Sequence, residues 1–320
     1  MKQILLLRPR GFCAGVVRAI DIVNIALDAY GAPIYVRKEI VHNRHVVEEL
    51  SARGAIFVDC CSQVPPGSRI IFSAHGVSPQ VREEARQRNL RVIDASCPLV
   101  MKVHLEAMKF ARAGYAIILI GHRDHDEVIG TLGEAPDRML LVSSVAEAER
   151  VAVPEPDRVA YLTQTTLSLD EASGIIECLR RRFPNIQGPP AQDICYATEN
   201  RQRAVKAITG RCDLLLVVGS GNSSNSKRLV EVAGNVGLRG YLIEDETAID
   251  LRWLDRVRSV ALTAGASAPE HLVQRVIAFL KKHGFTELQE VEVIEEDVRF
   301  ALPPELVAVP AGPGARLAQV

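Results

Sequence analysis

Short hydrophobic runs alternate with longer amphipathic segments along most of the chain. Residues 3–7 (QILLL) predict a buried strand, and residues 11–31 predict a helix that ends at Gly31. The apolar face of this helix is formed by Val16, Ile20, Val23 and Leu27. The same order recurs with a strand at 34–40 (IYVRKEI) and a helix at 42–54. Strands that alternate with helices in this way indicate an α/β fold with parallel sheets.

Three cysteines, Cys13, Cys97 and Cys195, each stand at the first turn of a predicted helix. A helix, a glycine, an apolar run and a polar loop follow each one, and the first polar residue lies 29, 28 and 28 residues beyond the cysteine. These first loops hold His42, then His125 and Glu127, then Ser223 and Asn225. The second polar loops of the three units hold His75, then Thr165 and Thr166, then Ser267. Because each loop lies between an apolar strand and a helix, we expect all of them at the carboxyl ends of parallel strands, where α/β proteins bind ligands.

The cysteines are separated by 84 and then 98 residues. This spacing exceeds the period of a solenoid repeat and favours three repeated α/β domains. A chain of 320 residues has room for two or three domains. The stretch 302–320 is rich in Pro, Gly and Ala, and its last dozen residues are expected to form a mobile tail.

Composition narrows the class of protein. The chain is 48% hydrophobic and 24% charged with a net charge of −1, which is typical of a soluble protein and favours neither nucleic acid nor an anionic membrane as a partner. The N-terminal residues include only a four-residue apolar run, so we predict no secretory signal and a cytoplasmic location. An odd number of cysteines, seven, argues against a disulfide framework.

The recurrence of three cysteines at equivalent places favours a shared metal-ligand role. Three thiolates suit a zinc ion or an iron–sulfur cluster. A four-iron cluster held by three cysteines leaves one iron open, as catalytic metal sites do. No role is assigned to the cysteines outside this register: Cys60, Cys61, Cys178 and Cys212.

His42, His75 and His125 occupy equivalent loops, so we expect them to bind phosphate or to transfer protons. His45 and His122 are their sequence neighbours and are expected to support them. The other histidines fall in helical patterns and are expected to be structural: His104, His271 and His283.

Glu127 is the only carboxylate in the repeat register. If its side chain faces the site formed by the polar loops, Glu127 is the natural general acid. Otherwise its charge complements the helix dipole. Asp124 and Asp126 flank it and compete for the same role.

Residues 219–228 (GSGNSSNSKR) begin with GxG but lack the third glycine of a dinucleotide-binding motif. Serine and asparagine side chains ahead of a helix suit a phosphate site, although they also cap ordinary helices. Ser267 has a similar setting ahead of Pro269 at a predicted helix start.

Eight segments, in this order, resemble the 4-hydroxy-3-methylbut-2-enyl diphosphate reductases, iron–sulfur enzymes of the methylerythritol phosphate route to isoprenoids: GFCAGVVRAI, EIVHNRHVVEEL, SAHGVS, DASCPLVMKVH, TQTTLS, DICYATENRQ, VVGSGNSSNS and TAGASAP. The resemblance covers roughly residues 1–300. It implies three similar domains, each a small parallel sheet flanked by helices, arranged as a pseudo-threefold trefoil around a central cluster. The implied boundaries are 14–96, 97–194 and 195–284 plus 1–13, followed by a C-terminal strand and tail at 285–320.

By that likeness, Cys13, Cys97 and Cys195 hold one 4Fe-4S cluster per chain, and the substrate hydroxyl oxygen binds its fourth iron. Glu127 matches the proton donor, and Thr166 is expected to share a hydroxyl network. The positions that match substrate contacts are His42, His75, His125, Thr165, Ser223, Ser224, Asn225 and Ser267.

The loop around Glu127 departs from the family pattern. Asp126 stands where the family usually has proline, and Asp124 where it usually has glycine. These extra carboxylates are expected either to shift the proton affinity of Glu127 or to be solvated.

The implied reaction is the reductive dehydroxylation of (E)-4-hydroxy-3-methylbut-2-enyl diphosphate to isopentenyl and dimethylallyl diphosphate plus water. It implies a low-potential electron donor such as ferredoxin or flavodoxin, and no nucleic-acid or membrane partner. The oligomeric state stays open between monomer and homodimer. Two other readings of the residues are a zinc enzyme that activates water and a non-catalytic redox sensor.

Overall fold

The computed structural model describes residues 2–307, and the predicted mobile tail lies outside the described residues. The described chain forms two compact units. The first unit comprises residues 2–14, 42–46 and 196–299. The second unit comprises residues 15–41, 47–195 and 300–307. Every strand pair in both units is parallel, as predicted.

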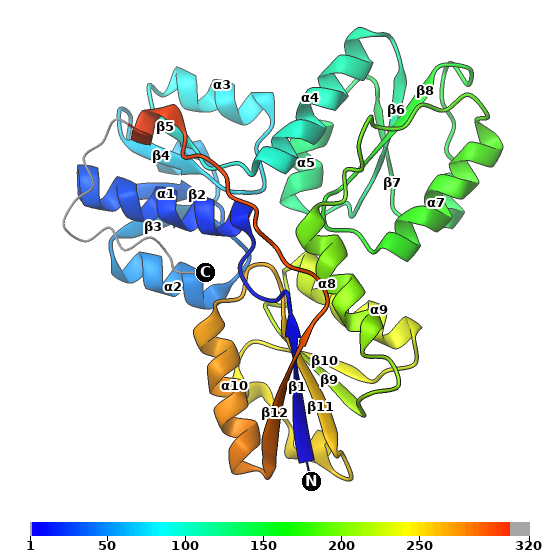
Figure 1. Cartoon of the computed structure of the whole chain (residues 1–320). Coiled ribbons are helices and arrows are strands. Elements are labelled where there is room, and N and C mark those ends of the chain that lie inside the picture. The colour runs from blue at the N-terminus through cyan, green and yellow to red at the C-terminus, as the bar shows by residue number, and fades with distance from the viewer. Residues whose placement is uncertain (1, 308–320) are drawn as a thin grey trace. The chain divides into compact units, whose positions relative to one another are not determined.

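The first unit contains a single sheet with the strand order β10-β9-β11-β1-β12. Its strands are β1 (Lys2–Arg8), β9 (Leu214–Val218), β10 (Gly240–Ile243), β11 (Ser259–Ala264) and β12 (Phe285–Glu292). Its helices are α8 (Tyr196–Ala207), α9 (Ser224–Asn235) and α10 (Glu270–Lys282), with short 3-10 helices at Glu246–Ala248 and Leu251–Leu254. In Figure 1, β1 lies between β11 and β12, so the N-terminal strand is part of the same sheet as β11 of the third predicted domain.

Helices cover both faces of this sheet. Ile4 and Leu6 of β1 belong to the same buried cluster as the apolar face of α10. Leu5 and Leu7 point the other way, into a cluster with residues of α8 and α9. Side chains that alternate between two covered faces explain why the strand sequences read as continuous hydrophobic runs.

The second unit contains two sheets, with the strand orders β3-β2-β4-β5 and β7-β6-β8. The strands are β2 (Ile34–Arg37), β3 (Ala55–Val58), β4 (Arg69–Phe72), β5 (Arg91–Asp94), β6 (Ala116–Ile120), β7 (Met139–Val142) and β8 (Val159–Thr163). The helices are α1 (Ala14–Tyr30), α2 (Arg44–Ala52), α3 (Pro79–Gln87), α4 (Pro98–Arg112), α5 (Asp126–Leu132), α6 (Val145–Ala148), α7 (Leu169–Arg182) and α11 (Pro304–Val307), with a 3-10 helix at Cys61–Gln63. The prediction of three small parallel sheets flanked by helices is confirmed. The two sheets of the second unit each fall within one predicted domain, whereas the sheet of the first unit also includes β12 from the predicted C-terminal segment 285–320. The domain boundaries stay a prediction.

The strand predicted at 34–40 is too long. It ends at Arg37, because Lys38 adopts a left-handed backbone conformation with φ of 59° that a strand cannot contain. The helix predicted at 42–54 begins at Arg44, which leaves His42 in the loop between the two elements.

A strand leads directly to two of the three register cysteines. β1 leads to Cys13 and β5 leads to Cys97. Residues 183–195, ahead of Cys195, form no strand, and only Gln187 makes an isolated bridge to Ala160. The segment contains three prolines, at 184, 189 and 190, which cannot donate to a strand ladder.

Candidate active site

Each of the three cysteines in register directly precedes a helix: Cys13 precedes α1, Cys97 precedes α4, and Cys195 precedes α8. The backbone N–H of each donates a hydrogen bond into a second polar loop. The acceptors are the carbonyl oxygens of Ala266 at 3.2 Å for Cys13, Ala74 at 2.9 Å for Cys97 and Thr165 at 3.0 Å for Cys195. The same local structure therefore occurs three times. For Cys97 and Cys195, this second loop belongs to the sheet that precedes the cysteine along the chain. For Cys13, it belongs to the sheet that contains β1.

All three thiols are partly exposed and none forms a disulfide. First-turn N–H groups of a helix are suited to hydrogen-bond anionic groups, including the sulfur atoms of a cluster. The remaining cysteines have different surroundings. Burial raises the pKa of the Cys212 thiol to about 11 and also raises the pKa of Cys61, so both thiols stay neutral. Cys178 is buried in the core beside α7.

Glu127 lies in the first turn of α5, and its side chain is buried with 3% of the residue exposed. Thr165 binds both carboxylate oxygens. Its backbone N–H donates to Oε1 at 2.6 Å, and its hydroxyl donates to Oε2 at 3.0 Å. Burial raises the pKa of Glu127 to about 7, while the two bonds from Thr165 act in the opposite direction. A buried carboxyl with this pKa can give up a proton near neutral pH.

The second unit places two histidines beside this acid. His125 caps the N-terminus of α5, and its Nδ1 accepts the backbone N–H of Glu127 at 3.3 Å. The ring of His75 meets that of His125 edge to face, with centroids 5.9 Å apart. The Oγ of Ser73 lies 3.3 Å from Nδ1 of His75. His75, His125, Glu127 and Thr165 therefore form one polar group in the second unit.

The competing acids lie in different settings. Asp124 is exposed and Asp126 is half-buried, so Glu127 alone among the three is buried. The structure also separates the two threonines. Thr165 binds Glu127, whereas the hydroxyl of Thr166 accepts Nε2–H of Gln164 at 2.8 Å.

The first unit gathers a second polar group, from three loops. Ser223 caps α9, and Ser223, Ser224 and Asn225 are all buried. The Oδ1 of Asn225 accepts the N–H of Ala266 at 2.9 Å. The hydroxyl of Ser267 donates to the carbonyl oxygen of His42 at 2.9 Å. Loops 42–46, 220–226 and 265–267 are thus tied together, and they present hydroxyl, amide and imidazole groups at the start of a helix.

Two glycines make this packing feasible. A Cβ at Gly219 would lie 2.2 Å from Oγ of Ser226, and a Cβ at Gly265 would lie 2.0 Å from the same atom. The first glycine of the GxG signal therefore makes room for a serine side chain inside the loop cluster. Close packing against Ser226 therefore accounts for Gly219, and no bound dinucleotide is needed to explain it.

A family model for the LytB protein matches residues 4–281. The chain belongs to the LytB family. A 4-hydroxy-3-methylbut-2-enyl diphosphate reductase from Acidothermus cellulolyticus is 57% identical over 306 residues, covering 95% of this chain and 90% of the relative. The reductase of the same name from Rhodococcus jostii is 56% identical over 308 residues, covering 96% of this chain and 92% of the relative.

Solved structures agree with the LytB assignment. The structure of the E-1-hydroxy-2-methyl-but-2-enyl-4-diphosphate reductase from Plasmodium falciparum matches with a TM-score of 0.93 and 42% identity, covering 95% of this chain and 96% of that one. A structure described as (E)-4-hydroxy-3-methyl-but-2-enyl diphosphate reductase, the terminal enzyme of the non-mevalonate pathway, matches with a TM-score of 0.61 and 29% identity, covering 88% and 100%. The resemblance seen in the sequence motifs is confirmed.

Sequence reasoning missed two residues that support the Cys13 loop of this LytB chain. The hydroxyl of Tyr196 accepts the N–H of Ala14 at 3.1 Å. Arg201 is fully buried, donates to the carbonyl oxygen of Gly11 at 2.7 Å and pairs with Glu296 at 3.1 Å. A signal was present, since the apolar residues Ala197, Ala204 and Val205 lie three or four positions from Arg201, on the same face of α8.

The two histidines expected to support these groups, His45 and His122, both have identified contacts. His45 Nε2 lies 3.4 Å from Asp245, and the backbone N–H of His122 donates to the side chain of Gln164. The structural expectation for His104 fits its full burial and its 2.8 Å contact with Glu134.

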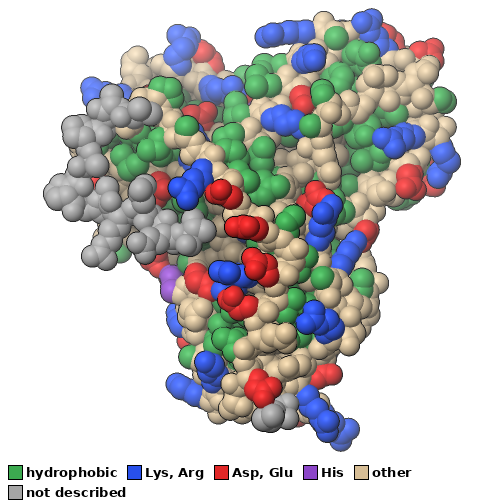
Figure 2. Space-filling view, viewed as in Figure 1, with side chains coloured by type: hydrophobic (Ala, Val, Ile, Leu, Met, Phe, Trp, Pro, Cys, Tyr) green, Lys and Arg blue, Asp and Glu red, His purple; other side chains and the backbone are tan. Residues whose placement is uncertain are grey.

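The surface adds two observations about this LytB chain. Positive and negative side chains are interspersed over the face shown in Figure 2, in keeping with the net charge of −1. Among the described residues, no helix combines the length and apolar character that crossing a membrane requires.

Proposed function

We propose that this chain reduces (E)-4-hydroxy-3-methylbut-2-enyl diphosphate to isopentenyl diphosphate and dimethylallyl diphosphate, the last step of the methylerythritol phosphate pathway. The substrate takes up two electrons and two protons, its C–O bond to the hydroxyl group breaks, and one water leaves. The observation that carries the proposal is the buried Glu127 carboxyl, whose pKa of about 7 suits it to supply a proton. The names and near-complete coverage of the LytB relatives support the substrate.

We further propose that Cys13, Cys97 and Cys195 hold a 4Fe-4S cluster. The donor set fits, because three thiols recur in one local structure, each at a helix start and each partly exposed. Three thiolates match a cubane that keeps one iron without a protein ligand. When bound, the cluster delivers single electrons and offers that iron as a Lewis acid.

The polar group of the first unit is proposed to bind the diphosphate. Ser223, Ser224 and Asn225 stand at the N-terminus of α9, where backbone N–H groups and the helix dipole attract anions. His42 and Ser267 lie in the adjoining loops and complete this set. Hydroxyl, amide and imidazole donors of this kind suit phosphate oxygens.

The polar group of the second unit is proposed to handle protons. Glu127 is held by Thr165 and oriented by the His125 cap, so its acidic proton is delivered from a fixed position. His75 and His125 are proposed to contact the substrate beside it. Thr166 is bonded to Gln164, so we propose that it acts by shaping the loop that carries Thr165.

A low-potential donor must supply the electrons, and ferredoxin or flavodoxin is the class we propose. Thiol ligands require a reducing compartment, which is why we place the enzyme in the cytoplasm.

Anaerobic reconstitution with iron and sulfide, followed by turnover of the hydroxylated diphosphate with a reduced dye, tests the proposal. We expect a brown protein that forms both products. A colourless protein that binds zinc in place of iron would indicate a water-activating metalloenzyme. An iron–sulfur protein without turnover would indicate a sensor.

A further inference from the structure

Cys195 differs from the other two register cysteines in how the chain reaches it. Strands β1 and β5 lead to the others and are held by backbone hydrogen bonds along their length. The proline-containing segment 183–195 has one bridging residue, Gln187. Its position therefore depends on other contacts.

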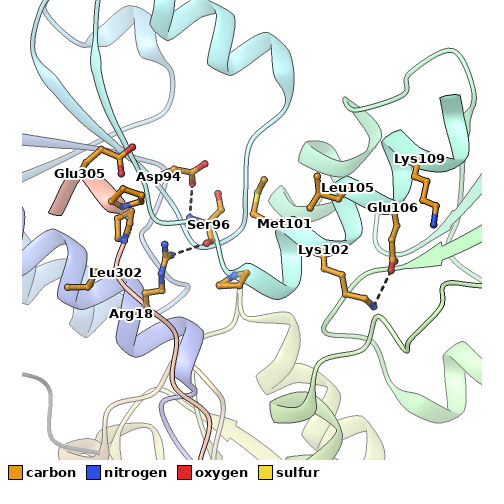
Figure 3. Close-up of a pocket in the computed structure, with 13 residues that line it drawn as sticks. Arg18, Asp94, Ser96, Met101, Lys102, Leu105, Glu106, Lys109, Leu302 and Glu305 are labelled. Atoms are coloured by element: carbon orange, nitrogen blue, oxygen red, sulfur yellow. Dashed lines mark hydrogen bonds and ion pairs between the residues drawn. The ribbon is translucent and has the colours of Figure 1, made fainter. Parts of the chain in front are cut away.

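Lys102 supplies such contacts from α4. Its Nζ donates to the carbonyl oxygen of Ala191 at 2.7 Å, to that of Gln192 at 3.1 Å and to Oδ1 of Asp193 at 3.0 Å. An ammonium group has three N–H donors, so this one segment accounts for all of them. Glu106, one turn further along α4, lies 3.6 Å from the same nitrogen. Figure 3 marks this ion pair with a dashed line.

Asp193 extends this attachment to the sheet. Its side chain is fully buried, and its Oδ2 accepts the backbone N–H of Thr163 at the end of β8 at 2.9 Å. Two residues later, Cys195 donates its own N–H to Thr165. The segment is thus fixed to Thr163 at the end of β8, to Thr165 in the loop that follows β8, and to Lys102 of α4. Helix α4 itself begins next to Cys97.

We propose that Lys102 and Asp193 are positioning residues that replace the missing strand and hold Cys195 ready to bind the cluster. The inference rests on the proposed function for the role of Cys195, while the attachment itself lies wholly within the second unit. A buried carboxylate bonded on both oxygens has a single favourable position, which is what a ligand-bearing loop needs.

The same helix provides a matched control. Lys109 lies seven residues after Lys102, and both line a cavity of about 620 Å³ with Leu105 and Leu302, drawn in Figure 3. Lys102→Met and Lys109→Met remove the same charge from the same helix, but only the first removes the contacts to residues 191–193.

Hydrogen exchange of the full chain, measured before iron and sulfide are added, tests the proposal. In Lys102→Met we expect peptides covering 184–196 to exchange about tenfold faster, because bonds to a charged group are lost, while peptides covering 91–98 match the parent. After reconstitution, we expect iron to be lost to a chelator about tenfold faster. Lys109→Met should match the parent in both measurements.

Parent-like exchange over 184–196 in Lys102→Met would overturn the proposal, as would an equal acceleration along the whole chain or in Lys109→Met. If Lys102→Met fails to fold, Asp193→Asn serves as a second variant, since it keeps the side-chain shape and is expected to show the same local acceleration. A parent chain that takes up no iron and sulfide would contradict the proposed function instead, and the exchange result would still stand.

Discussion

Asp124, Asp126 and Glu127 lie within four residues of one another and differ mainly in their surroundings. The α5 helix turns Glu127 inward, where Thr165 binds both of its carboxylate oxygens. Asp124 stays exposed. A carboxyl that loses water without gaining a cation holds its proton to higher pH, so burial is what distinguishes Glu127, the proposed acid, from its two neighbours.

Replacing Glu127 by Gln should abolish most turnover while keeping substrate affinity, because the amide keeps the shape but has no acidic proton. We expect turnover with a reduced dye to fall about 100-fold to 10,000-fold, with substrate affinity changed only slightly. Asp124→Asn is the matched control and should turn over like the parent. Parent-like turnover in Glu127→Gln would show that another group donates the proton.

Glu127 should also make stability depend on pH. Its pKa is raised from 4.5 to about 7 in the folded chain. The folded chain therefore binds more protons than the unfolded chain between these values, so the contribution of Glu127 is fully present below pH 4.5 and is lost as pH rises through 7. The size of the effect is about 3 kcal/mol. We expect the free energy of unfolding of the parent to fall, relative to Glu127→Gln, by up to this amount between pH 5 and pH 8 in urea titrations. A constant difference would mean that Glu127 has an ordinary pKa.

At the scale of elements, the start of α9 is built by close packing of three loops. Ser223 caps α9, because its Oγ accepts the backbone N–H of Ser226 at 3.3 Å. Gly219 and Gly265 leave the space that the Ser226 side chain fills. The proposed diphosphate site therefore also depends on small residues outside the proposed set of substrate contacts.

Gly265→Ala should disturb this site, because the added Cβ would lie 2.0 Å from Oγ of Ser226. We expect a loss of about 1–3 kcal/mol in the free energy of unfolding and a higher KM for the diphosphate substrate. Adding Ser226→Ala should restore part of the stability, since the nearest remaining contact is 3.1 Å to Cβ. Gly221→Ala is the control, because nothing lies within 4 Å of its Cβ position. An unchanged unfolding midpoint for Gly265→Ala would show that the loops can accommodate the added methyl group.

At the scale of the whole molecule, the proposed ligands and contacts are divided between the two compact units. Cys13 and the polar group of α9 belong to the first unit, while Cys97, Cys195 and Glu127 belong to the second. The hydrogen bonds described above for these residues each join residues of a single unit. The proposed cluster ligands thus include residues from each unit.

Iron and sulfide content tests this directly. Serine substitution of Cys13, Cys97 or Cys195, each alone, should sharply reduce iron and sulfide retained after anaerobic reconstitution, because each removes one of three thiolate ligands. Cys178→Ser is the control, since that thiol is buried in the α7 core. If Cys178→Ser lost as much iron as the others, or if a register cysteine were dispensable, the ligand set would be wrong.

The fold class, the three register cysteines and the family motifs could be predicted from the sequence alone. Hydrophobic periodicity and glycine positions predicted parallel α/β units, and the threefold spacing separated Cys13, Cys97 and Cys195 from the other cysteines. These features are local, because helix and strand periods and helix starts are encoded within a few turns of chain. The reductase motifs are likewise contiguous, so the order of residues is enough to recognise them.

The way in which distant residues meet depends instead on the tertiary fold. Glu127 is distinct from Asp124 through its contacts with Thr165, 38 residues away. Lys102 is linked to the segment before Cys195 across 91 residues by its contact with Asp193. Burial and side-chain hydrogen bonds depend on which loops the fold brings together, and no spacing along the chain encodes them. The sequence thus indicated which side chains are candidates for the chemistry, and the fold determined their burial and their hydrogen-bond partners.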